Sequence, residues 1–168
     1  MAYGLSGAAV VDHPLSYVLY LYNLFSTMED GLYEISHPHF GPIFIPTGAP
    51  KGFPVQTGIH GAIASTISIK NQGNNRYSLT PATAFPVPDR PAIGATNDVA
   101  RVVILAAPGT AEYTEWEIDL NEGGAETYLI HTPRDSGNKY WNALGEDSQI
   151  ELQNFDGNPF QEWKLKKL

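Results

Sequence analysis

The chain has 168 residues, no cysteine and a formal charge of −8 at pH 7, from 18 acidic and 10 basic residues. This charge disfavours binding to nucleic acid, or to a membrane through a basic patch, because both require a positive surface. The lack of cysteine excludes a disulfide framework, a thiolate metal site and a cysteine nucleophile. The 16 glycines and 13 prolines separate short β-type runs, which is typical of a single all-β domain.

Residues 1–28 are predicted to form an N-terminal extension or leader before a domain that spans 29–168. The extension contains a strongly apolar run at 15–25 (LSYVLYLYNLF), which is too short to cross a bilayer. No basic region precedes it and no small-residue cleavage site follows it, so we expect no signal peptide and predict a cytoplasmic protein. The segment is either an arm that adds a strand to a partner or packs on the domain, or a leader from an upstream start codon.

Three sets of matching positions recur along residues 29–168. The first set comprises the triplets Tyr33-Glu34-Ile35, Tyr77-Ser78-Leu79 and Tyr128-Leu129-Ile130. The second comprises the triplets Ile67-Ser68-Ile69, Trp116-Glu117-Ile118 and Trp163-Lys164-Leu165. The third lies 12, 12 and 13 residues before the second, at Val55, Ile104 and Ile150. Units that repeat at this period bury their apolar faces against their copies.

The alternation of residue types assigns the two faces of each segment. In residues 113–120, Trp116 and Ile118 fall on an inner face. The acidic residues fall on the opposite face, which predicts a half-buried strand with a solvated acidic stripe at Glu115, Glu117 and Asp119. The stretches at 71–75 (NQGNN) and 121–124 (NEGG) have the chemistry of hairpin turns.

Three similar units of about four short strands, joined by hairpins, predict a β-trefoil, which is a barrel with pseudo-three-fold symmetry and a hairpin cap. The unit boundaries are expected at 29–73, 74–123 and 124–168. An up-and-down barrel or a sandwich does not require this three-fold register. The conspicuous aromatic residues of the repeat are therefore expected in the core, at Tyr33, Tyr77, Trp116, Tyr128 and Trp163.

The sequence contains no Gly-x-Ser-x-Gly elbow, no phosphate-binding glycine loop and no His-Glu-x-x-His pair. We therefore predict a protein that is not an enzyme, with no catalytic residues, no cofactor and no metal site. His37-Pro38-His39 pairs two imidazoles, but no acidic residue stands at ligand spacing, and the proline favours a solvated turn. Function on an inert barrel is expected in the loops that project from it.

The first candidate loop spans residues 47–54 (TGAPKGFP), where Ala49, Pro50, Lys51 and Gly52 are predicted to form a reactive loop. Prolines on both sides of Lys51 restrict the unbound loop, so binding loses less conformational entropy. An extended loop with one lysine fits the acidic specificity pocket of a trypsin-like serine protease, where it binds as a substrate does. The alternative is that Lys51 is a solubilising residue on a tight turn.

The second candidate loop spans residues 133–141 (PRDSGNKYW) in the third repeat. Arg134 or Lys139 is a secondary candidate for the same inhibitory role. Alternatively, Asp135, Trp141 and Asn142 form a sugar-binding site through stacking and hydrogen bonding. A core position in the cap is the other interpretation of Trp141.

The opening strand of the domain, at 30–35 (DGLYEI), resembles that of the mushroom β-trefoil serine protease inhibitors, the mycospins. The stretch 106–109 (AAPG) before 114–118 (TEWEI), followed by 128–130 (YLI), is similar to the same family. The resemblance covers about residues 29–168 and rests mostly on core positions. It implies a fungal protein that inhibits trypsin-like proteases through a loop of the first repeat, in defence or in control of proteolysis, commonly without a secretion signal.

The end of the third repeat, at 156–163 (DGNPFQEW), carries a Gln-x-Trp motif that is similar to ricin-type lectin lobes. Such lobes bind sugar through an Asp, a stacking aromatic residue and an Asn or Gln. This resemblance implies a carbohydrate-binding protein with a glycan partner as the alternative to an inhibitor with a protease partner. Only the third repeat keeps the motif, which is also a packing element.

Overall fold

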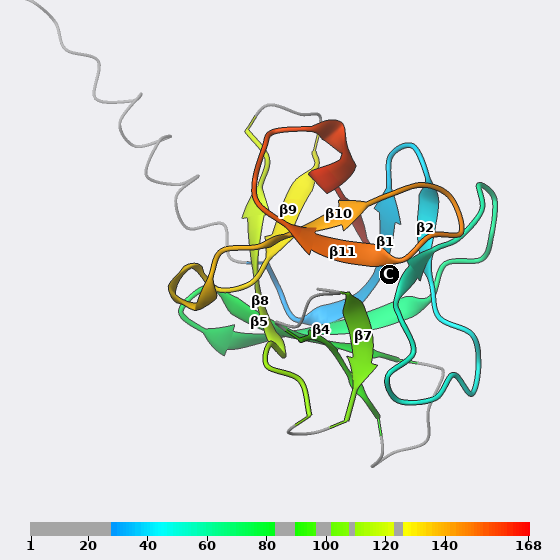
Figure 1. Cartoon of the computed structure of the whole chain (residues 1–168), viewed down its shortest axis with the longest axis horizontal. Coiled ribbons are helices and arrows are strands. Elements are labelled where there is room, and N and C mark those ends of the chain that lie inside the picture. The colour runs from blue at the N-terminus through cyan, green and yellow to red at the C-terminus, as the bar shows by residue number, and fades with distance from the viewer. Residues whose placement is uncertain (1–27, 83–89, 97–101, 108–109, 123–125) are drawn as a thin grey trace, which may run out of the picture.

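The computed structural model describes residues 28–82, 90–96, 102–107, 110–122 and 126–168 (Figure 1). The predicted N-terminal extension, except Met28, and part of the predicted turn at 121–124 lie outside the described residues. None of the helices in these ranges is long and apolar enough to cross a membrane.

Within the described residues, each repeat contributes four strands. The first repeat contains β1 (Gly31–His37), β2 (Gly41–Phe44), β3 (Gln56–Thr57) and β4 (Thr66–Gly73). The second contains β5 (Arg76–Pro81), β6 (Ala92–Ala95), β7 (Val103–Ala106) and β8 (Glu115–Leu120). The third contains β9 (Tyr128–His131), β10 (Tyr140–Ala143), β11 (Ile150–Gln153) and β12 (Lys164–Lys167), with the 3₁₀ helices η1 (Arg134–Ser136) and η2 (Pro159–Gln161).

The barrel consists of β1, β4, β5, β8, β9 and β12, and its neighbouring strands are antiparallel. The ring closes where Tyr128 of β9 bridges Trp163, with hydrogen bonds of 2.7 and 2.9 Å in the two directions. The remaining strands pair as the hairpins β2–β3, β6–β7 and β10–β11. This barrel with one cap hairpin per repeat is a β-trefoil, as the sequence predicts, and closure protects the strand edges.

The third set of repeat positions marks where the cap hairpins meet. Val55 N–H donates to Val103 O at 2.8 Å, and Ile150 N–H donates to Val55 O at 3.0 Å. Val55 and Ile150 are fully buried, while Ile104 is half-buried. The contacts therefore join one strand from each repeat, so the sequence spacing reflects real three-fold packing.

The core is built around three tryptophans that are completely buried. The Trp141 ring makes edge contacts with Trp116 at 5.1 Å and with Trp163 at 5.7 Å between ring centroids. Tyr33 and Tyr77 are also buried, and Tyr128 packs against the cluster while partly exposed. The prediction that the repeated aromatic residues form the core is confirmed.

The predicted turn at 71–75 joins β4 to β5 as a tight hairpin. Asn74 and Asn75 have φ values of 52° and 59°, which is the left-handed conformation that a type I′ turn requires at both central positions. Asparagine tolerates this conformation better than most residues, which explains the Asn-Asn pair at this junction between repeats.

The outer face of β8 differs from the predicted solvated stripe. Glu117 is only 8% exposed, and its carboxylate lies 3.5 Å from Arg134 Nη1 and 3.9 Å from His131 Nε2. His131 is fully buried and hydrogen-bonds to Asp119 at 3.2 Å, which is the largest cause that lowers the pKa of Asp119. The prediction is wrong for Glu117 and Asp119 because the third repeat supplies His131 and Arg134 to pair with them.

Candidate functional site

The loop between β2 and β3 carries the predicted reactive residues, but it is not extended. Ala49 N–H donates to Pro46 O at 3.1 Å, and Phe53 N–H donates to Pro50 O at 3.0 Å, so the loop consists of two successive β-turns. Gly48 and Gly52 have φ values of 76° and 88°, as type II turns require at their third position. The prediction of an extended loop is therefore wrong, because residues 46–53 form two tight turns.

Lys51 is exposed at the corner of the second turn, and the residues around it are anchored. Ala49 is buried in the core at 6% exposure. Gly52 N–H donates to Leu105 O at 2.7 Å, and Leu105 N–H donates to Phe53 O at 2.9 Å, which fixes the loop to β7 of the second repeat. Pro50, Lys51 and Gly52 project from this anchored base into solvent.

The secondary inhibitory candidates in the third repeat are already engaged by other side chains. Arg134 follows Pro133 in η1 and forms ion pairs with Glu117 and Asp119. Lys139 donates a hydrogen bond to the side chain of Asn154. The salt bridges among the described residues do not include Lys51, which leaves it better placed than Arg134 to meet an acidic pocket on another protein.

The residues predicted to bind sugar do not form one site. Trp141 is fully buried in the tryptophan cluster and Asn142 is 3% exposed, so neither contacts a ligand on the surface. Asp135 is exposed and forms an ion pair with Arg76 at 2.5 Å. Hydrogen bonds from Ser136 and Arg76 hold the pKa of Asp135 below its usual value. This sugar site is a wrong prediction, since β10 is buried on both faces.

The Gln-x-Trp motif serves as a packing element. Gln161 is fully buried, donates to Asn154 O at 2.8 Å and accepts from Asp156 N–H at 3.3 Å. Both bonds lie within the loop between β11 and β12, so they fold this loop around the buried Gln161 side chain. Trp163 Nε1 donates to Trp141 O at 3.3 Å in the core.

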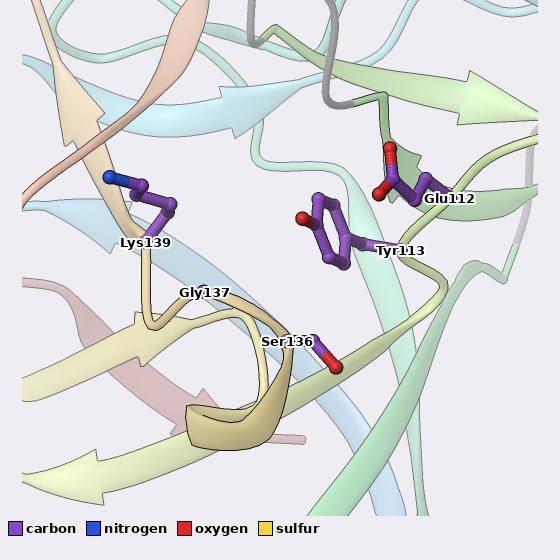
Figure 2. Close-up of a pocket in the computed structure, with 5 residues that line it drawn as sticks. All are labelled: Glu112, Tyr113, Ser136, Gly137 and Lys139. Carbon is purple, nitrogen blue, oxygen red and sulfur yellow. The ribbon is translucent and has the colours of Figure 1, made fainter.

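An open cleft of about 520 Å³ lies between the second and third repeats (Figure 2). The residues that line it come from the segment before β8, from the end of η1 and from the turn after η1, and they are Glu112, Tyr113, Ser136, Gly137 and Lys139. A smaller cleft of about 260 Å³ shares Glu112, Tyr113 and Ser136, and Arg76, Thr114, Glu115 and Pro133 also line it.

Of the residues that line the larger cleft, only Lys139 is a candidate from the sequence. Tyr113 lies three residues before Trp116, where the other repeats have Ala64 and Phe160. An aromatic residue at a position where the copies disagree is a signal of function, but the cleft itself depends on two loops from different repeats. Sequence spacing within one repeat does not predict such a contact.

The His37-Pro38-His39 turn is not a chelate, and His37 is not solvated. His37 is 2% exposed and its Nδ1 accepts the backbone N–H groups of His39 and Phe40, both at 3.2 Å. With Nδ1 as an acceptor, Nε2 carries the proton and donates to Pro159 O at 3.0 Å. The prediction of a solvated turn is wrong for His37, because its ring also stacks on Phe40 at 4.6 Å.

Burial is the main cause that lowers the pKa of His37 below its usual 6.5. As the pH drops below about 6.5, His37 therefore takes up a proton more readily in the unfolded chain than in the folded chain. The free energy of unfolding should fall over this range. We expect His37→Gln to reduce this slope in denaturant unfolding between about pH 7.5 and 5.5. His39→Gln, on the exposed side of the same turn, is the control. An unchanged slope in His37→Gln would contradict this assignment.

No protein-family description and no curated protein sequence matches the chain. Among solved structures, ThreeFoil, a designed 3-fold symmetric protein, is similar with a TM-score of 0.64 and 17% identity, over 83% of this chain and 100% of that chain. A proteinase inhibitor from Coprinopsis cinerea is similar with a TM-score of 0.60 and 9% identity, over 84% and 99%. A lectin from Polyporus squamosus bound to a Neu5Ac-containing epitope is similar with a TM-score of 0.61 and 15% identity, over 85% and 51%.

These similarities show the β-trefoil fold, at identities too low to show more. An inhibitor and a lectin, the two groups that the sequence resembles, both occur among the similar structures. Proteins of different function thus share this fold, and what this chain binds depends on its own loops.

Proposed function

We propose that the protein is a protease inhibitor, not an enzyme, which binds a trypsin-like serine protease through Lys51 on the loop between β2 and β3. The observation that supports this most strongly is the exposure of Lys51 at a turn corner whose flanks are fixed to the core. A fixed loop loses little conformational entropy on binding. A specificity pocket with a carboxylate at its base takes a single long cation.

The turn conformation also supplies a reason for inhibition rather than cleavage. Gly52 has a φ of 88° and reverses the chain directly after Lys51, so the Lys51–Gly52 bond does not follow the extended path of a substrate. The hydrogen bond from Phe53 N–H to Pro50 O spans this bond, and the bond from Gly52 N–H to Leu105 O fixes its C-terminal side to β7. They hold the two ends in place, so hydrolysis is slow and a cleaved bond readily reforms.

The test is the inhibition constant of loop variants against trypsin, measured with a chromogenic peptide substrate. We expect Lys51→Ala to weaken inhibition at least about a hundredfold, because a charged anchor in a protease pocket is a binding hot spot. Lys70→Ala removes another exposed lysine of the first repeat and should leave inhibition unchanged. Equal inhibition by Lys51→Ala and the unmodified protein would refute the role of this loop.

A further inference from the structure

We propose that a groove at one end of the barrel is a docking site for residues 15–25 of the same chain. This barrel-end groove lies where β1 and β9 begin and where β8 and β12 end, opposite the cap hairpins. Its volume is about 380 Å³. The loop that carries Lys51 contributes no residue to its lining, so the proposal does not depend on the proposed function.

Side chains with large apolar parts form most of the lining of the barrel-end groove. Leu120 ends β8 and is 50% exposed, while Ile118 on the same strand is buried. The other apolar and aromatic lining residues are Met28, Tyr33, Tyr128 and Leu165. Exposed apolar surface that gathers in one place is characteristic of an interaction site, because covering it removes apolar area from water.

The charged groups that line the barrel-end groove neutralise each other. Glu29 and Lys167 form an ion pair, and their side chains are 80% and 46% exposed, which places the pair at the rim. A charged ligand would compete with this pair, whereas a neutral one leaves it intact. Residues 15–25 (LSYVLYLYNLF) are rich in leucine and tyrosine and contain no charged residue, so their chemistry matches that of the groove.

The chain enters the domain at this groove and is fixed there. Met28, the last residue of the predicted N-terminal extension, lines the groove and packs against the core. Its N–H donates to the Tyr77 hydroxyl oxygen at 2.8 Å. The carbonyl of Glu29 accepts from the Tyr33 hydroxyl group at 2.8 Å, and its carboxylate pairs with Lys167. The residues before Met28 are therefore tied to a fixed point in the groove.

The length of the connection favours docking within one chain. Residues 26–28 connect the run at 15–25 to the domain, and three residues span at most about 10 Å. A short connection gives the tethered segment an effective concentration of about millimolar. The same segment from a second copy of the chain, present at micromolar concentration, competes poorly with it.

The test measures how fast single thiols react with DTNB in the whole chain, which has no cysteine of its own. Leu120→Cys places a thiol in the groove. Leu144→Cys, between β10 and β11, is the matched control, because Leu120 and Leu144 are 50% and 52% exposed. We expect Leu120→Cys to react at least about tenfold more slowly, because the docked segment must first leave the groove. Leu165→Cys on β12 provides the same measurement if Leu120→Cys does not fold.

Two substitutions in the segment identify what covers the groove. Leu21→Asp together with Leu24→Asp puts charges into the apolar run, so the rate of Leu120→Cys should rise to that of Leu144→Cys, whose own rate should not change. Equal rates without these substitutions overturn the proposal, as does slow reaction of Leu120→Cys that persists with them. Protection that grows with protein concentration between about 1 and 100 μM would assign the groove to a second copy and overturn docking within the chain. All variants should inhibit trypsin equally, so this proposal and the Lys51 proposal fail independently.

Discussion

Trp141→Ala should lower the free energy of unfolding by about 3–5 kcal/mol, the usual cost of removing a fully buried tryptophan. Trp141 is completely buried and joins Trp116 to Trp163, so its removal leaves a cavity between rings that belong to the second and third repeats. The surrounding strands are closed into a barrel and have little freedom to collapse into this space. Denaturant unfolding followed by far-UV circular dichroism measures the change without relying on tryptophan fluorescence.

Two further variants separate the contribution of packing from a general effect of substitution. Leu144→Ala removes a neighbouring side chain that is 52% exposed, and it should change stability by no more than about 0.5 kcal/mol. Trp141→Phe keeps an aromatic ring and removes an indole N–H that has no hydrogen-bond partner among the described residues. It should therefore cost much less than Trp141→Ala, and equal costs would contradict a role for ring packing.

His131→Ala should destabilise the protein by about 3–5 kcal/mol, because it breaks a buried charge network. His131 is fully buried, and its Nδ1–H donates to Thr132 O at 2.8 Å while Nε2 faces Asp119 at 3.2 Å. Both ring nitrogens of His131 therefore face oxygen atoms of the folded protein. Its removal leaves Glu117, which is 8% exposed, with Arg134 as its only charged partner among the described residues.

The control is the double variant that combines His131→Ala with Asp119→Asn, and its stability is measured by thermal and denaturant unfolding. If the cost comes from an uncompensated carboxylate, Asp119→Asn should recover part of the stability lost in His131→Ala. The pKa of Asp119 is lowered in the folded protein, chiefly by the hydrogen bond with His131. The corresponding stability is present above its usual pKa of 3.8 and is lost as the pH falls through the folded value, so His131→Ala should flatten the acid limb of the stability profile. A purely additive double variant would argue against the network.

The sequence predicts the barrel well because its signals are regular and repeated. The spacing of Val55, Ile104 and Ile150 corresponds to the meeting point of three strands, and alternation correctly buries Trp116 and Ile118. These signals depend on positions within one repeat and its copies. A three-fold barrel satisfies all of them together.

The sequence does not predict the surroundings of residues that depend on contacts between repeats or on turn conformation. Glu117 was expected in solvent because its partners, His131 and Arg134, lie in the next repeat. The sequence leaves two interpretations of Trp141, a sugar site and a core position in the cap, because alternation does not reveal that β10 is buried on both faces; its complete burial confirms the core position. Gly52 beside Lys51 was the available sign of a turn, since glycine is the residue that most readily adopts a positive φ.

The proposed function on an anchored loop of an otherwise inert barrel is tested most directly by titration of trypsin with the unmodified protein. A fixed amount of trypsin receives increasing amounts of the chain, and residual activity on a small substrate is measured after equilibration. We expect activity to fall linearly and to end at about one equivalent, as tight binding by a single loop requires. Full trypsin activity in a large excess of the protein would contradict the account.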